Sequence, residues 1–221
     1  MKQQNRARAR ELANESIKRG EPLEWFEKLY AEAKTESAAI PWADLEANPH
    51  LIEWVNNSNM DWHGKKALKI GCGLGDDAEY LSSLGLNVTA FDISETAINW
   101  CHERFPESRV DYRIADLFDL PEAWKSSFDL VVESYTLQVL PVDRRQIAID
   151  KIASLISPSG KAVVICRGRN ENDPAGEMPW PLTKKEIEYF SDNGLQIENF
   201  EDFVDKETPS VRRFRIELFR T

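Results

Sequence analysis

The amino-acid sequence predicts an α/β fold, in which a mostly parallel sheet carries helices on both faces and follows a helical N-terminal extension. Three observations carry this prediction. Apolar residues recur every three to four positions over residues 1–60. From residue 65, short apolar runs alternate with helical patterns, which is typical of a parallel sheet. Residues 195–219 contain two apolar runs joined by a polar turn, so one edge of the sheet is predicted to be antiparallel.

The N-terminal extension is predicted to contain three helices. Its apolar residues follow helical spacing: Leu12, Ile17, Leu23, Phe26, Leu29 and Tyr30. Pro22 lies near the start of the second helix, as is usual for proline. The third helix is expected over residues 44–56, because the Asn- and Ser-rich run that follows would end it.

The remaining elements follow in order. Five apolar runs are predicted as strands: residues 67–70, 87–91, 110–114, 128–133 and 162–166. Helices are predicted at residues 76–84, 95–104 and 143–156. Thr183 and Glu186 have the spacing of a capping box, which predicts a helix over residues 183–192. Residues 195–203 and 211–219 are predicted as the two final strands.

Composition narrows the class of protein. The chain has 221 residues, 42% of them hydrophobic, which suits one domain with an elaboration. Its formal net charge of -10 would repel nucleic acid over most of the surface. Three scattered cysteines without metal spacing favour a reducing compartment. The chain has no apolar run of about 20 residues and no secretory pattern at its N-terminus. We therefore expect a soluble cytoplasmic protein that binds neither nucleic acid, membrane nor metal.

The most informative motif lies between the first strand and its helix, where residues 71–75 read Gly-Cys-Gly-Leu-Gly. Glycines at this point permit a tight turn and a close approach of ligand to backbone. A dinucleotide fingerprint requires a third glycine one residue later, where this chain has Asp76, followed by Asp77. Carboxylates at a helix N-terminus would oppose a pyrophosphate. The loop therefore favours a ligand that has positive charge and no phosphate, as S-adenosylmethionine does.

Two further acidic residues end predicted strands. Asp92 lies about 20 residues beyond the first glycine, where a carboxylate can accept hydrogen bonds from ribose hydroxyls. Asp116 follows the third strand, where it can accept from the amino group of adenine, while Leu117 and Phe118 cover the base. The alternatives are that Asp92 caps the next helix, a role that Ser94 already fills, and that Asp116 is a surface residue.

Together these motifs resemble those of class I S-adenosylmethionine-dependent methyltransferases. The resemblance covers residues 65–167 and adds the runs Phe-Asp-Leu-Val-Val-Glu at 128–133 and Leu-Ile-Ser-Pro-Ser-Gly at 155–160. It implies a Rossmann-like sheet of seven strands with an antiparallel C-terminal strand. It also implies S-adenosyl-L-methionine as cofactor and S-adenosyl-L-homocysteine as product. The implied cofactor-binding residues are Gly71, Cys72, Gly73, Gly75, Asp77, Asp92, Ile93, Asp116, Leu117 and Glu133. One departure is Lys69, because many members have an acidic residue there.

The N-terminal extension is similar to that of the thiopurine, thiol and halide methyltransferases. The likeness lies in a Trp-rich segment around Trp25 and in the Pro-Trp element at Trp42, although a glycine usual after that element is absent. By this resemblance both tryptophans contact cofactor or substrate, and residues 1–60 cover the site that residues 61–221 form. The alternative is that the tryptophans only pack the helices.

The candidate catalytic residues follow the fourth predicted strand, and they are Glu133 and Tyr135. Methyl transfer is a displacement at an activated carbon, so the protein mainly positions a small-molecule acceptor and excludes water. The resemblance implies a thiol or other sulfur or halide acceptor; an oxygen or nitrogen acceptor is the alternative. Glu133 is equally compatible with a structural role. Arg167 and Arg169 are compatible with binding a substrate anion or with salt bridges. A nicotinamide oxidoreductase and a non-catalytic cofactor-binding protein are the alternatives of other classes, and the sequence predicts no oligomeric state.

Overall fold

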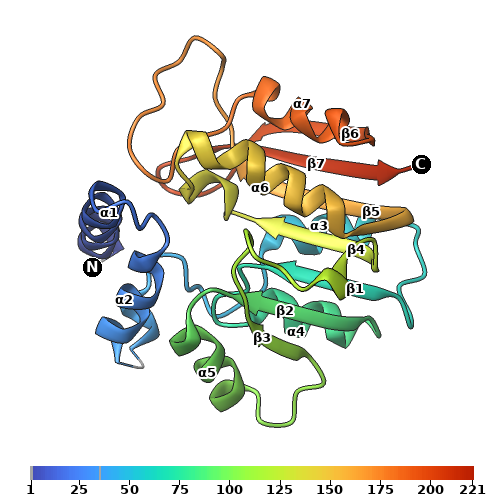
Figure 1. Ribbon diagram of the computed structural model, residues 1–221, viewed down its shortest axis with the longest axis horizontal. Coiled ribbons are helices and arrows are strands. Elements are labelled where there is room, and N and C mark those ends of the chain that lie inside the picture. The colour runs from blue at the N-terminus through green and yellow to red at the C-terminus, as the bar shows by residue number, and fades with distance from the viewer. Residues whose placement is uncertain (1, 35) are drawn as a thin grey trace.

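A seven-stranded sheet forms the centre of the molecule (Figure 1). The computed structural model describes residues 2–34 and 36–221. The strand order is β3-β2-β1-β4-β5-β7-β6. Strands β1 to β5 are parallel, and β7 lies antiparallel between β5 and β6. The strands are β1 (Lys66–Ile70), β2 (Asn87–Asp92), β3 (Asp111–Ile114), β4 (Phe128–Ser134), β5 (Ile156–Arg167), β6 (Leu195–Val204) and β7 (Arg212–Arg220). This confirms the predicted α/β fold and its antiparallel C-terminal strand.

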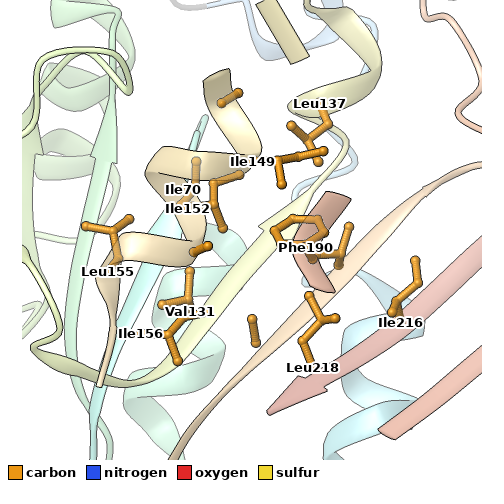
Figure 2. Close-up of a cluster of buried hydrophobic side chains, with 14 of the residues drawn as sticks. Ile70, Val131, Leu137, Ile149, Ile152, Leu155, Ile156, Phe190, Ile216 and Leu218 are labelled. Atoms are coloured by element: carbon orange, nitrogen blue, oxygen red, sulfur yellow. The ribbon is translucent and has the colours of Figure 1, made fainter. Parts of the chain in front are cut away.

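Helices cover both faces of this sheet. They are α1 (Lys2–Lys18), α2 (Glu24–Ala33), α3 (Pro49–Asn57), α4 (Asp76–Ser83), α5 (Glu95–Arg104), α6 (Val142–Leu155) and α7 (Lys184–Asp192). Helices α6 and α7 pack on one face, where Ile149, Ile152 and Phe190 meet strand residues such as Val131 and Leu218 (Figure 2). Helices α3, α4 and α5 supply the core of the opposite face. None of the described helices is long and apolar enough to span a bilayer.

Two element boundaries differ from the sequence-based predictions by five residues or more. Helix α3 begins at Pro49 rather than at residue 44, because the Asn48 side chain caps it by accepting from the His50 N–H at 2.9 Å. Strand β5 begins at Ile156 rather than at residue 162. The predicted turn at residues 158–160 is an irregularity within the strand, where the register with β4 shifts between Phe128 and Leu130.

Helices α1 and α2 lie across the edge of the sheet at which β1 and β4 end (Figure 1). Their apolar residues form a third core with the glycine loop and helix α5, in which Trp25 and Tyr30 are buried. Glu27 of α2 accepts hydrogen bonds from the Ser94 hydroxyl at 2.6 Å and the Thr96 hydroxyl at 2.5 Å. These bonds attach α2 to the start of α5, beside the carboxyl end of β2.

Candidate functional site

The loop between β1 and α4 is a turn that only glycine fits. Gly71 and Gly75 have φ values of 55° and 91°, a region that side chains other than glycine rarely adopt. A Cβ atom on Gly71 would lie 2.5 Å from the Thr136 Oγ1 atom, and one on Gly75 would lie 2.5 Å from the Tyr112 hydroxyl oxygen. Neighbouring side chains therefore pack directly against Gly71 and Gly75, and the loop presents only backbone at these two positions. We call this loop, residues 71–75, the glycine cradle.

Cys72, between the first two glycines, is part of the support of this loop. Its N–H donates to the Phe91 carbonyl oxygen at 2.9 Å, which ties the loop to β2. Burial raises the pKa of its thiol well above the usual value. A buried thiol of raised pKa is a poor nucleophile, so Cys72 contributes backbone and volume rather than reactivity.

Asp92 joins the loop to the start of helix α5. Its carboxylate accepts from the Gly73 N–H at 2.9 Å and from the Ser94 N–H at 3.0 Å. Ser94 caps the helix by accepting from the Ala97 N–H at 3.0 Å, as the sequence predicted. Burial raises the pKa of Asp92, although the two N–H donors act against this rise. Asp92 thus lies at the carboxyl end of β2, against the second glycine of the loop.

Asp77 is held by three elements. Its carboxylate accepts from the Asn48 N–H at 2.7 Å and from the Ser134 hydroxyl at 3.2 Å. Lys69 is buried, with 2% of its surface exposed, and its ammonium lies 3.6 Å from the same carboxylate. Lys69 is therefore a buried cation whose counter-charge is on the helix that follows the loop. Its neighbour Asp76 instead pairs with Arg104 at 2.7 Å.

Asp116 lines a cleft at the ends of β2 and β3. The cleft has a volume of about 280 Å³, and its walls include Leu23, Ile93, Asp116, Phe118 and Arg144. Asp116 accepts from the Phe118 N–H at 2.8 Å, and Leu117 lies beneath the cleft in the core. Small-molecule pockets span about 300–1,000 Å³, so this cleft suits one end of a nucleoside ligand rather than the whole of it.

Glu133, predicted as a candidate catalytic residue, is fully buried. Its Oε1 atom accepts from the N–H groups of Thr136 at 2.6 Å and Leu137 at 3.0 Å, and its Oε2 atom is buried without a partner. Burial raises its pKa to about 7, against the effect of these N–H groups. This placement favours the structural role for Glu133, as a positioning residue for the loop after β4, over direct contact with the acceptor.

Tyr135 is at the turn that follows β4. Its φ of 67° is rare for a non-glycine residue and costs about 1–3 kcal/mol, so the surrounding structure must hold it in place. The Tyr135 N–H donates to the Ile165 carbonyl oxygen at 2.9 Å. Its ring lies 4.8 Å from the Arg213 guanidinium carbon. Strained residues of this kind cluster at functional sites, and Tyr135 lies at the same edge as the glycine loop.

The two predicted tryptophans have different environments. Trp42 is 37% exposed, and its indole N–H donates to the Tyr30 hydroxyl at 2.9 Å. Trp25 is fully buried and stacks on Phe26 with ring centroids 4.0 Å apart. The burial of Trp25 therefore favours the alternative that it packs the N-terminal helices.

Tyr30 is a site residue that the sequence did not reveal. A Cβ atom on Gly73 would lie 3.2 Å from its hydroxyl oxygen, so Tyr30 closes the glycine loop from the side of α2. In the sequence Tyr30 is only one member of an apolar helical pattern, and no local signal separates it from Leu29. The part of the chain that the structure describes has no group of three or more His, Cys, Asp or Glu residues arranged to hold a metal ion.

Comparison with known families bears directly on this edge of the sheet. Residues 67–160, from β1 to the irregularity in β5, match the family described as a methyltransferase domain. This part of the chain is therefore similar to methyltransferase domains. The match includes the glycine loop, Asp92, Asp116 and Tyr135, so the matched part of the chain contributes most of the residues that line the edge.

Curated relatives of this chain include ubiquinone biosynthesis O-methyltransferases. The protein from Aromatoleum aromaticum is 31% identical over 127 residues, which are 57% of this chain and 53% of the relative. The protein from Pseudomonas aeruginosa is 30% identical over 148 residues, which are 62% of each chain. The chain thus spans a little over half the length of these relatives.

Solved structures share the fold at lower identity. The N-methyltransferase NodS from Bradyrhizobium japonicum, in complex with S-adenosyl-L-homocysteine, gives a TM-score of 0.68 at 19% identity, covering 87% of this chain and 98% of that one. The magnesium protoporphyrin IX methyltransferase from Synechocystis, with bound S-adenosylmethionine, gives 0.61 at 20%, covering 78% and 76%. The 4+2 cyclase SpnF gives 0.70 at 15%, covering 88% and 93%. At these identities the likeness establishes the fold alone.

Proposed function

We propose that this protein is an S-adenosylmethionine-dependent methyltransferase that acts on a small-molecule acceptor. One observation carries the proposal. The glycine cradle, Asp92, the cleft at Asp116 and the strained Tyr135 follow one another along the carboxyl ends of β1, β2, β3 and β4. Ligands of open α/β sheets bind at this edge.

The residues present fit the cofactor at each point. In the proposal, the glycine cradle takes the methionine end, Asp92 the ribose, and the cleft lined by Ile93 and Asp116 the adenine. When bound, the cofactor supplies a methyl group that its sulfonium already activates. The protein then orients the acceptor and excludes water. Trp42 and the helices of residues 1–60 would cover the site, which supports their expected role as a lid over the core of residues 61–221.

We further propose that the acceptor atom is an oxygen. The O-methyltransferase names of the curated relatives support this, and they weigh against the thiol or halide acceptor that the N-terminal resemblance implies. Glu133 is fully buried, so its side chain does not reach an acceptor, and burial also raises the pKa of Tyr135. With these two groups unsuited to be a base, the site favours an acceptor that ionises readily. A phenolic hydroxyl, with a pKa near 10, meets this requirement better than an alcohol. A thiol, with a pKa of about 8.5, ionises more readily still, so the preference for oxygen rests on the names of the curated relatives, and a thiol is the second candidate.

Two measurements test the proposal. Titration calorimetry should show one molar equivalent of S-adenosylmethionine bound and no binding of NADH; the reverse result would make the protein a nicotinamide enzyme. Incubation with methyl-labelled S-adenosylmethionine and a panel of phenols, thiols, amines and halides should then label phenols first. Label in thiols alone would overturn the oxygen assignment, and binding without any transfer would favour a non-catalytic cofactor-binding protein.

A further inference from the structure

Arg167, at the end of β5, is a half-buried cation without a partner. Among the residues that the structure describes, its guanidinium makes no hydrogen bond and no ion pair, and its Nε atom is buried without an acceptor. Arg169, two residues later, is the opposite case. Its guanidinium donates to the carbonyl oxygens of Pro181 at 3.1 Å and Asp173 at 2.9 Å, and it lies 3.8 Å from Glu186. Of the two arginines at this strand end, Arg169 is bonded within the fold, and the guanidinium of Arg167 has no partner among the residues that the structure describes.

Further positive charge surrounds Arg167. Residue Arg213 of β7 is its register partner across the antiparallel pair of β5 and β7, so the two side chains leave the same face of the sheet. Arg6 of α1 is close enough to act on it as well. Burial, Arg213 and Arg6 together lower the pKa of Arg167. Two strands thus bring Arg167 and Arg213 together, and the charge of Arg6 from helix α1 also acts on Arg167.

Two carboxylates nearby bind Arg213 directly. Asp205 and Glu207 lie 2.8 Å and 2.6 Å from its guanidinium, and the charge of Glu207 also acts on Arg167. Three arginines against two carboxylates leave one net positive charge in this cluster, in a chain whose formal net charge is -10. A buried donor that the protein does not satisfy is unfavourable unless a ligand satisfies it.

The position of Arg167 indicates which part of the site a ligand bound to it would occupy. Its own N–H is bound by the side chain of Gln138, which follows Tyr135 in the turn after β4, at 2.8 Å. The Arg213 guanidinium lies over the Tyr135 ring. The arginines therefore adjoin the turn after β4, away from the cleft of Asp116 at the opposite end of the site, which belongs to the nucleoside end of the cofactor.

We propose that Arg167 binds an anionic group of the methyl acceptor, a carboxylate or a group of similar charge, with Arg6 and Arg213 adding to its field. This inference rests on the proposed methyltransferase function and names the substrate class of that site. A planar guanidinium binds a carboxylate through two parallel N–H···O bonds, which fixes the orientation of the acceptor as well as its charge. The acceptor is thus a molecule with an anionic group beside its acceptor atom, such as a phenol that also has a carboxylate, rather than a neutral phenol.

The test compares acids with their neutral amides on the full-length protein. Benzoate against benzamide, and phenylacetate against phenylacetamide, are titrated by calorimetry with and without saturating S-adenosyl-L-homocysteine. Each carboxylate should bind at least about tenfold more tightly than its amide, as a charge-assisted pair requires. Arg167→Gln should reduce this ratio to within about twofold, and Arg167→Lys should keep part of it. Arg113→Gln is the matched control, because Arg113 is an exposed strand arginine that pairs only with Asp111.

The outcomes separate the two proposals. The anion site is refuted if wild-type protein binds acids no better than amides. It is also refuted if the Arg167→Gln and Arg113→Gln variants both keep the full preference for acids. Failure of the protein to bind S-adenosyl-L-homocysteine would instead refute the methyltransferase function, whatever the acids do. Thermal unfolding of each variant identifies any that fail to fold, and Arg167→Lys then provides the comparison with wild type.

Discussion

Replacing Asp92 by Asn tests the residue that joins the glycine loop to the proposed cofactor. The carboxylate accepts from the N–H groups of Gly73 and Ser94, at 2.9 Å and 3.0 Å, through different oxygens. Asparagine keeps one acceptor and places an NH₂ group where the other oxygen was. One of the two backbone N–H groups then faces a donor instead of an acceptor.

The size of the effect follows from this geometry. A hydrogen bond to a charged acceptor contributes about 1.5–3 kcal/mol, and Asp92 is nearly fully buried, so solvent does not replace it. If ribose binding depends on the same carboxylate, the affinity for S-adenosylmethionine should fall by roughly tenfold to 150-fold. Titration calorimetry measures this directly. Asp92→Ala should lose at least as much.

The control is Asp129→Asn. Asp129 also accepts from a backbone N–H, that of Lys66 at 2.9 Å, but at the opposite ends of β1 and β4. This variant should lose stability while keeping wild-type affinity for the cofactor. The reasoning fails if Asp92→Asn binds S-adenosylmethionine as tightly as wild-type protein, because the carboxylate would then serve only to cap the helix and hold the loop.

Three other substitutions test the site. Gly71→Ala should destabilise the protein in urea by more than Gly176→Ala, since both glycines have positive φ but only Gly71 would place a Cβ against a neighbour; equal losses would mean that no steric constraint exists. Glu133→Gln should be more stable than wild-type protein at pH 8, by on the order of 1–3 kcal/mol. Because the pKa of Glu133 is raised to about 7, the protonated carboxyl adds stability that is fully present below about pH 4.5 and is lost as the pH rises to 7. The difference in stability between Glu133→Gln and wild-type protein should therefore vanish near pH 4.5. A difference that does not change with pH would refute the assigned cause. Tyr30→Phe removes the acceptor of the Trp42 N–H, so it should cost about 1 kcal/mol in unfolding and shift the tryptophan emission that reports on Trp42; an unchanged spectrum would contradict the contact.

Much of the fold could be predicted because its signals are local. Ser94 and Thr183 cap the helices that follow them, and the side chains that make each cap lie within three residues of one another in sequence. The start of α3 was missed although its signal, Asn48 before Pro49, is also local, because the apolar pattern suggested an earlier start. The start of β5 was missed for another reason. Pro158-Ser159-Gly160 has the composition of a turn, and only pairing with β4 extends the strand through it.

Some residues of the candidate site could also be predicted from local sequence, whereas the reason for others is visible only in the structure. Gly71, Asp92 and Asp116 can be predicted from spacing along the chain, because each lies at or just after the end of a strand that the apolar pattern identifies. Lys69 appeared as an anomaly in the sequence. The structure gives the reason, since the counter-charge of Lys69 is Asp77, the second residue of helix α4.

What the sequence determined alone was the order of strands and helices, their caps, and the glycine turn, all of which depend on interactions between residues close along the chain. The tertiary structure decided which polar groups are satisfied. It buried Glu133 and Trp25 and brought Tyr30 to the glycine loop. It gave the Arg169 guanidinium partners, whereas the Arg167 guanidinium has none within residues 2–34 and 36–221. The physical reason is that burial and charge pairing depend on residues that only folding brings together. Two arginines of the same strand end are alike in sequence and differ only in what the fold places beside them.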